Sequence, residues 1–280
     1  MIIDRTDALA ALRRSKLVRD DSGPTRVYRD PAGNVYHSVT TILGATADKT
    51  NLEGWAARQD RIYGPGAADK DRNTAATRGS QAHSQAEYLL KTTNKVARAT
   101  ANRRGVLRID AHGLPHIPTP IYRWAMDRCR HNLPPVSLSA KGYARGLIEW
   151  IAANVTQCHA CEFSIHHPAG FAGTADALLT VAQSPEIDLT GAPLVVDFKT
   201  SANKRGPAML ADYTLQLGAY SLGLEHLTGL RPLGALIVVA RRVGPPDITF
   251  ISRSSLTIAE AGFLDRLDAF KALPPTAPTP

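Results

Sequence analysis

Two acidic residues and a lysine fall on neighbouring predicted strands, in the segments Gly173-Thr174-Ala175-Asp176 and Val195-Val196-Asp197-Phe198-Lys199-Thr200. Alternate residues of a strand face the same side, so Asp197 and Lys199 project together while Phe198 points to the opposite face. Two carboxylates can hold a hard divalent cation, and a lysine beside them sits near an attacking water or the charge that develops on a phosphate. The pattern therefore indicates divalent-metal phosphodiester hydrolysis.

The surroundings of Asp197 strengthen this interpretation. The run Leu194-Val195-Val196 follows a turn signal at residues 191–193 and predicts a buried strand that ends at Asp197. A carboxylate there is costly unless it meets a cation or a hydrogen-bond donor. Asp-x-Lys alone is common by chance, and the simple alternative is a surface strand with an exposed ion pair.

Two predicted helices carry further polar residues at helical spacing. His83 and Glu87 are one turn apart, and Gln216 and Tyr220 share a face of an amphipathic helix. Each has a structural alternative. His83 can be an ordinary core or surface histidine, Glu87 can pair with Lys91, and Gln216 and Tyr220 can simply pack.

These residues form an ordered set along the chain: His83, Glu162, Asp176, Asp197-x-Lys199 and Gln216-x-x-x-Tyr220. The set resembles the PD-(D/E)XK nuclease superfamily. Within it, the set is similar to the RecB-like and Cas4-like exonuclease branch, which includes the mitochondrial genome-maintenance exonuclease. The segment at residues 36–43 also resembles small, often phage-encoded members. The resemblance spans about residues 36–252.

The resemblance implies a metal site that takes Mg²⁺ or Mn²⁺. Asp176, Asp197 and the backbone carbonyl of Phe198 would be ligands, and His83 would be the additional ligand typical of the RecB-like branch. Glu162, on the preceding predicted strand, is a further candidate near this ion or a second one.

The resemblance also implies the roles of the other residues. Lys199 would orient the water and neutralise charge in the transition state. Gln216 and Tyr220 would brace the site and contact the DNA backbone, and Arg78 is a candidate phosphate contact.

The implied activity is hydrolysis of single-stranded DNA or of DNA ends by a metal-dependent exonuclease, in recombination, repair or replication. DNA is thus the expected partner, with recombination or replication proteins as possible others. Two alternatives stay open. One is a structure-specific endonuclease of the same superfamily, and the other is a non-catalytic DNA-binding protein that retains the fold.

Composition agrees with a nucleic-acid partner. The 280 residues carry a formal net charge of +8, and the pI is near 9.6, which suits a polyanion. No apolar run reaches membrane-spanning length, and charged residues at positions 4, 5 and 7 interrupt any signal-peptide pattern. We therefore expect a soluble protein of the cytoplasm of a bacterium or a phage-infected host.

The cysteines exclude one cofactor of this branch. An iron–sulfur cluster of the Cas4-like type needs four cysteines, three of them beyond the Gln-x-x-x-Tyr helix, and this chain has only Cys129, Cys158 and Cys161. The pair Cys158 and Cys161 could hold zinc with His159 or His166, but no second pair accompanies it. Reduced thiols are the expectation.

The predicted fold is α/β, with a restriction-endonuclease-like core in which helices flank a mixed central sheet, preceded by a helical half. We divide the chain into a leader (1–34), a helical region with His83 and a DNA-contacting insertion (35–156), the nuclease core (157–272) and a disordered tail (273–280). Helices are predicted at 49–63, 69–91, 120–132, 138–154, 207–225 and 257–271, and one begins at residue 39 with Ser38 as N-cap. Strands are predicted at 160–166, 172–182, 193–199, 234–241 and 247–252, and a basic surface loop or short hairpin at 92–118.

The insertion carries the candidate DNA contacts Arg123, Arg128 and Arg145. They alternate with Trp124 and Trp150, which could stack on bases or could be core residues. A long connection at residues 182–193 leaves Glu186 and Asp188 as competitors of Asp176 for the first acidic position.

Overall fold

The structure is a computed structural model that describes residues 9–23, 25–182, 191–202 and 206–274. Within this part of the chain, eight strands form one mixed sheet in the order β1-β2-β3-β7-β8-β9-β10, with β6 paired to β7. The pairs β3–β7 and β8–β9 are parallel, and the other pairs are antiparallel. The strand bounds are β1 Val18–Asp20, β2 Val27–Arg29, β3 Val35–Ser38, β6 Val155–His167, β7 Phe171–Val181, β8 Leu194–Ser201, β9 Gly234–Arg241 and β10 Asp247–Ser252.

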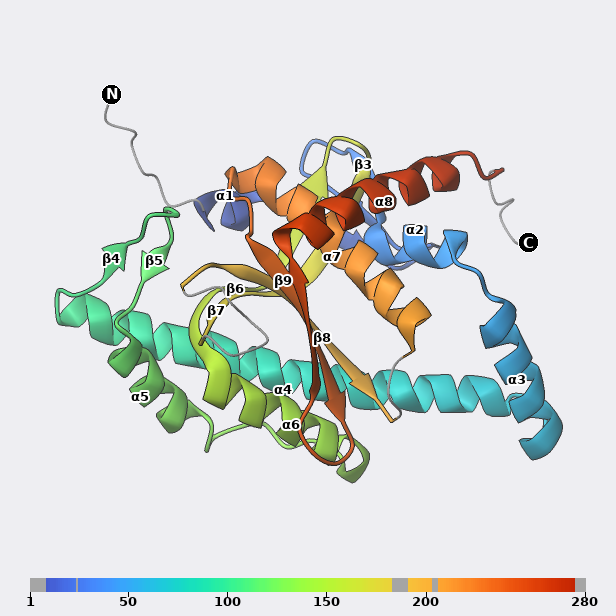
Figure 1. The fold of residues 1–280 in the computed structure, drawn as a ribbon, viewed down its shortest axis with the longest axis horizontal. Helices are drawn as coiled ribbons and strands as arrows, with labels where there is room; N and C mark the ends of the chain where they lie inside the picture. Colours follow the sequence, from blue (N-terminus) through green and yellow to red (C-terminus); the bar gives the residue numbers. More distant parts are fainter. Residues whose placement is uncertain (1–8, 24, 183–190, 203–205, 275–280) are drawn as a thin grey trace.

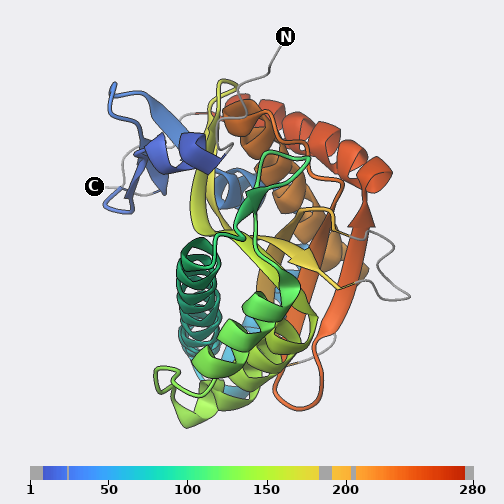
Figure 2. The same ribbon diagram turned by 90° about the vertical axis from the view of Figure 1, so that its left-hand side faces the viewer.

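Helices cover both faces of this sheet (Figures 1 and 2). One apolar core packs α4 (Ala67–Arg103), α5 (Thr119–Cys129) and α6 (Leu138–Asn154) against the sheet. The other core holds α1 (Leu9–Arg14), α2 (Val39–Thr46), α7 (Pro207–Thr228) and α8 (Arg253–Lys271). The central strands are buried on both faces, which explains why β8 and β9 begin as unbroken apolar runs. The predicted α/β class with a mixed, helix-flanked sheet is confirmed.

Helix α4 is longer than the sequence pattern predicted. We expected a basic loop from residue 92, but the helix continues to Arg103. The buried side chains that hold this extension are Thr93, Ala97, Thr100 and Ala101. They repeat at helical spacing but are small or polar, so they give no strong apolar pattern. The alternative of a hairpin near His112-Gly113 is confirmed by β4 (Arg108–Ile109) and β5 (Pro115–His116).

Most other predicted elements agree with the structure to within a few residues, including α3 (Thr50–Tyr63). Ser38 does precede α2, but its hydroxyl meets the Thr40 hydroxyl at 2.9 Å and caps no amide. The strands β1, β2 and β3 were not predicted, because three or four residues near turn signals give no alternation to recognise. Glu186, Asp188 and tail residues 275–280 lie outside the described residues.

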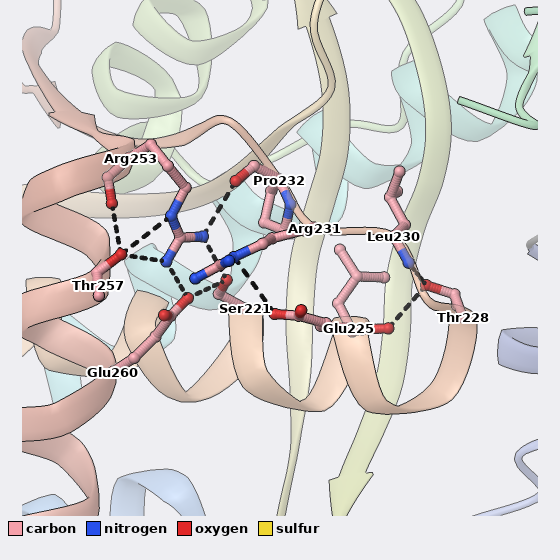
Figure 3. Close-up of polar contacts among 10 residues, drawn as sticks. Ser221, Glu225, Thr228, Leu230, Arg231, Pro232, Arg253, Thr257 and Glu260 are labelled. Atoms are coloured by element: carbon pink, nitrogen blue, oxygen red, sulfur yellow. Dashed lines mark hydrogen bonds and ion pairs between the residues drawn. The ribbon is translucent and has the colours of Figure 1, made fainter. Parts of the chain in front are cut away.

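The α7–α8 contact is close and polar at its centre. A Cβ on Gly218 of α7 would lie 2.6 Å from the backbone carbon of Ala259 in α8, so only glycine permits this approach. Arg253 forms an ion pair with Glu260 at 2.5 Å and also donates to Ser221 of α7 at 3.3 Å (Figure 3). Because α7 carries Gln216 and Tyr220, this network fixes the helix that faces the candidate site.

None of the helices in the described part of the chain has the length and apolar character needed to cross a bilayer.

Candidate active site

The candidate site lies where one edge of β7 has no strand partner. Along that edge β3 pairs with Phe171 and Ala172, and β8 pairs with residues 177–179. Between them, residues 173–175 pair only with β6, on the other edge, and Asp176 has no registered strand partner within the described structure. The motif Gly173-Thr174-Ala175-Asp176 thus occupies an opening between two neighbouring strands.

Asp176 closes part of this opening with its side chain. Its Oδ2 accepts a hydrogen bond from the amide nitrogen of Phe198 at 2.6 Å. The last registered β7–β8 pair is Ala177 with Val196, so the carboxylate takes over where the backbone ladder stops. It is therefore held close to the β8 backbone at Phe198.

A polar network connects β8 to α7. Lys199 Nζ donates to Asp197 Oδ1 at 2.8 Å and to Gln216 Oε1 at 3.3 Å. Gln216 Nε2 donates to Asp197 Oδ1 at 3.0 Å and to the Tyr220 hydroxyl at 2.8 Å. Asp197 and Lys199 thus share a face of β8, as the alternation predicts, while Phe198 packs into the α4–α6 core on the opposite face. The side chains of Asp197, Gln216 and Tyr220 are buried, whereas Lys199 is 21% exposed.

Helix α4 brings His83 to the same opening. Its Nδ1 lies 3.7 Å from Asp176 Oδ2, and its ring meets the Phe198 ring edge-on, with centroids 6.4 Å apart. One turn earlier, a Cβ on Gly79 would lie 3.0 Å from Thr200 Oγ1 of β8. The missing side chain lets the helix approach the strand closely enough for His83 to reach Asp176.

A second glycine makes room for Tyr220. A Cβ on Gly173 would lie 2.8 Å from Tyr220 Cε1 and 3.3 Å from Val39 Cγ2. The ring of Tyr220 therefore packs directly on the β7 backbone at Gly173, three residues before Asp176. This contact sets the position of the hydroxyl that accepts from Gln216.

The electrostatics of the cluster follow from burial of several charges. Burial raises the pKa of Asp197 to about 6 despite the opposing charge of Lys199, and it also raises the pKa of Asp176. Burial and the Lys199 charge lower the pKa of His83 to about 4, so this imidazole is neutral at pH 7. Burial lowers the pKa of Lys199, but the charges of Asp197 and Asp176 outweigh it, and the net direction is upward. Burial therefore works against the charged forms of both carboxyl groups, and a bound cation would favour those charged forms.

The family model described as PD-(D/E)XK nuclease superfamily matches residues 54–270, most of the chain. The chain belongs to the PD-(D/E)XK nuclease superfamily. Comparison with the curated proteins gives no match. As a PD-(D/E)XK protein the chain is a nuclease, and nucleases of this superfamily generally use divalent metals such as Mg²⁺ and act on DNA.

The donor set of the candidate site suits such a metal. Asp197 Oδ2 is buried, and among the described residues its ion-pair partner is the Lys199 ammonium at 2.7 Å. A buried carboxylate oxygen that is paired only with an ammonium can also ligate a hard cation. His83 and Asp176 stand close enough to share one ion. No three His, Cys, Asp or Glu side chains converge in the described residues. The Phe198 backbone carbonyl would therefore have to complete the ligand set.

The two neighbouring glutamates of this PD-(D/E)XK site differ in setting. Glu87 pairs with Lys91 one turn along α4, which confirms the structural alternative for that residue. Glu162 lies between the registered β6–β7 pairs Cys161–Ala177 and Phe163–Ala175, and so stands opposite Asp176. Burial and then the charges of Asp176 and Glu87 raise the pKa of Glu162 to about 7.

Of the predicted DNA contacts, Gln216 and Tyr220 belong to the hydrogen-bonded cluster, whereas the arginines lie outside it. Arg78 of α4 stacks over the buried Tyr143 ring at 5.1 Å from its centroid. Arg123, Arg128 and Arg145 are exposed on α5 and α6, and Arg145 forms an ion pair with Glu149 at 3.3 Å. Of the two tryptophans, Trp150 is a core residue, whereas Trp124 is 48% exposed.

Sequence reasoning missed Tyr213 in α7. Lys199 Nζ lies over its ring, 4.9 Å from the centroid, so Tyr213 forms a cation–π contact with the ammonium. Its position three residues before Gln216 and seven before Tyr220 places all three on one helix face, a spacing that could have identified it. Cys129, Cys158 and Cys161 are free thiols in the structure.

Proposed function

We propose that this nuclease is a Mg²⁺- or Mn²⁺-dependent deoxyribonuclease that acts as an exonuclease on single-stranded DNA or on DNA ends. The observation that carries the proposal is the joint arrangement of Asp176, Asp197 and Lys199 at the open β7 edge, where Lys199 contacts both oxygens of the buried Asp197 carboxylate. The preference for exonuclease rests on resemblance, through His83 and the Gln216-x-x-x-Tyr220 helix. The proposed setting is recombination, repair or replication in a bacterium or a phage-infected cell.

Asp176, Asp197, the Phe198 carbonyl and His83 would hold the metal ion, with Glu162 as a further candidate. The bound ion would supply charge stabilisation on the phosphate oxygens. The neutral imidazole of His83 keeps a lone pair for a metal, because protonation requires a pH near 4.

Lys199 and residues of α7 would position the reacting groups and the DNA backbone. Lys199 remains an ammonium, because the charges of both aspartates outweigh the effect of its burial, and it would donate to the attacking water or the phosphate. Gln216 positions Lys199 and Asp197 relative to each other. The Tyr220 oxygen accepts from Gln216, which leaves the phenol hydrogen to donate to the DNA backbone.

The exposed arginines would position the strand. The Arg128 guanidinium lies 5.9 Å from the centroid of the exposed Trp124 ring, and Arg104 and Trp124 line one cavity of about 210 Å³. An aromatic face among cations suits a stacked base and its phosphates. Arg78, Arg123 and Arg145 are proposed phosphate contacts on the same physical grounds.

Degradation assays with labelled DNA test the proposal. We expect wild type to shorten linear single-stranded DNA with Mg²⁺ or Mn²⁺, and Asp197→Asn and Lys199→Ala to lose this activity. Asp127→Asn, which changes a carboxylate that is 67% exposed on α5, serves as the control and should match wild type. Wild-type rates in both site variants would refute the proposal.

Circular single-stranded DNA separates the two nuclease alternatives. A strict exonuclease leaves a closed circle intact, whereas a structure-specific endonuclease opens it. Titration with Mn²⁺ in a calorimeter addresses the third alternative, because a non-catalytic DNA-binding protein should show no tight metal site that depends on Asp176.

A further inference from the structure

A second polar cavity lies beside the candidate active site, between α1, α4 and β6. Its volume is about 380 Å³, in the range of pockets that hold small molecules. Ser15 at the end of α1, Asn94 and Arg98 of α4, and residues 159–164 of β6 line it. Apart from Glu162, which is a further candidate for the metal site, none of the residues lining this cavity has a role in the proposed nuclease mechanism.

Three buried polar atoms of the lining have no hydrogen-bond partner within the described structure. They are Ser15 Oγ, Asn94 Oδ1 and His159 Nδ1, contributed by three different elements. His159 is only 8% exposed, and its Nε2 meets Thr180 Oγ1 at 2.8 Å, which fixes the ring. Buried polar groups in proteins are nearly always paired with protein atoms or ordered water, so three such atoms around one cavity mark it as a place for polar partners.

Strand β6 departs from regular geometry along this cavity. The β6–β7 register shifts between Cys158 and Ala160, which places His159 in a bulge. Glu162 has φ +49°, the only positive φ at a non-glycine residue in the described chain. Bulges of this kind often re-aim side chains near functional sites.

A polar stripe on α4 connects the cavity to the metal site. His83, Glu87, Lys91, Asn94 and Arg98 follow one another at spacings of four, four, three and four residues, and so lie on one helix face. At 1.5 Å per residue, Asn94 lies about 16 Å along the helix from His83. Glu162 lines the cavity and stands opposite Asp176, so the two sites also meet across β6 and β7.

The chemistry of the lining fits a nucleotide. Arg98 has no ion-pair or hydrogen-bond partner among the described residues, and a guanidinium beside a hydroxyl is suited to a phosphate. The amide of Asn94 can both donate and accept, as the edge of a base requires, and the ring of His159 offers one further polar atom. About five stacked nucleotides, at 3.4 Å each, span the distance from His83 to Asn94.

We propose that this cavity binds one nucleotide unit, with its phosphate on Arg98 and Ser15 and its base edge on Asn94 and His159. The proposal rests on the proposed nuclease function, which supplies nucleotides in two forms. One is the terminal nucleotide of the substrate strand, and the other is the mononucleotide that hydrolysis releases.

Equilibrium binding to the whole protein in EDTA, where no hydrolysis occurs, tests the proposal. The probes are dAMP, and ten-residue DNA oligonucleotides with or without a 5′ phosphate or a 3′ phosphate. We expect saturable binding of dAMP or of a phosphate-ended oligonucleotide, weakened at least tenfold in Arg98→Gln and in Asn94→Ala. Lys95→Ala removes an exposed cation from the adjacent α4 position, outside the cavity, and should change binding less than twofold.

The outcomes distinguish a bound strand end from a bound product nucleotide, and failure of the nucleotide site from failure of the nuclease function. Tighter binding of one phosphate-ended oligonucleotide than of dAMP assigns the cavity to that strand end, and equal binding assigns it to the product. If neither probe binds, or if Arg98→Gln behaves like Lys95→Ala, the cavity holds only water and the proposal is overturned. Ser15→Ala replaces any variant that circular dichroism shows to be unfolded. DNA degradation by Asp197→Asn is measured separately. The nuclease function can therefore be supported even if the nucleotide site is refuted.

Discussion

The carboxylate of Asp176 accepts the amide hydrogen of Phe198 at 2.6 Å and so replaces the ladder bond that β7 and β8 stop making at this point. The same contact ties the first acidic residue of the motif to the backbone between Asp197 and Lys199. The Asp176 side chain therefore has two roles, a structural hydrogen bond to Phe198 and the proposed metal binding. A useful substitution removes one role and keeps the other.

Asp176→Asn makes that separation. The amide oxygen of asparagine can still accept from Phe198, so we expect the fold to persist, while the lost charge should abolish tight Mn²⁺ binding and reduce DNA hydrolysis by more than about a hundredfold. Asp176→Ala should in addition lose roughly 1–3 kcal/mol of stability, because it leaves a buried N–H without a partner. Calorimetry with Mn²⁺ and urea unfolding measure the two effects. Tight Mn²⁺ binding by Asp176→Asn would exclude a ligand role.

The sequence was sufficient for the part of the site that alternation and helical spacing control. Asp197 and Lys199 share a face because strand residues alternate, and Gln216 and Tyr220 share one because helical residues repeat at four. Both rules are local, so each pair could be predicted from a single strand or a single helix. The same holds for the buried strands β8 and β9.

What the sequence did not predict depends on contacts between distant segments. The open edge of β7 arises because β3, from far earlier in the chain, pairs with the start of that strand. Nothing in the sequence shows that Gly79 leaves room for the helix that carries His83, or that Gly173 leaves room for the ring of Tyr220. The extension of α4 to Arg103 depends on packing by small residues, which a hydrophobic pattern does not register.

Gly218→Ala should destabilise the protein by about 1–3 kcal/mol, because the new methyl group would overlap the backbone of α8. Gly54 in α3 is the matched control, since a Cβ there meets nothing within 4 Å. Gly54→Ala should leave stability unchanged or raise it by up to about 1 kcal/mol through helix propensity. Urea unfolding gives both values, and equal stability of the two variants would contradict the close α7–α8 contact.

Arg253→Met should cost about 3–5 kcal/mol, because it leaves the carboxylate of Glu260, which is 6% exposed, buried without its cation. Arg145→Ala tests an ion pair of the opposite kind, with both side chains about 70% exposed, and should change stability by less than about 1 kcal/mol. Thermal and urea unfolding of both variants decide the point. A loss as small in Arg253→Met as in Arg145→Ala would show that the network in Figure 3 contributes little.

We expect the free energy of unfolding to fall on acidification, because the buried His159 resists protonation in the folded protein. Burial lowers the pKa of this histidine from 6.5 to about 4, with His116 and His112 acting in the same direction and Asp110 against them. Between these two values the unfolded chain binds more protons than the folded one, so the free energy of unfolding decreases as the pH falls from about 6.5 to 4. The full effect is roughly 3 kcal/mol and is absent above pH 7.

His159→Gln isolates this contribution, because glutamine does not titrate in that range and the remaining groups are unchanged. Urea unfolding at pH 4.5, 5.5 and 7.0 should give a flatter dependence for His159→Gln than for wild type. The exposed His131 provides the comparison, and His131→Gln should follow the wild-type curve. Parallel curves for wild type and His159→Gln would mean that this imidazole is protonated in the folded protein, and that His159 does not remain a neutral group beside the polar cavity.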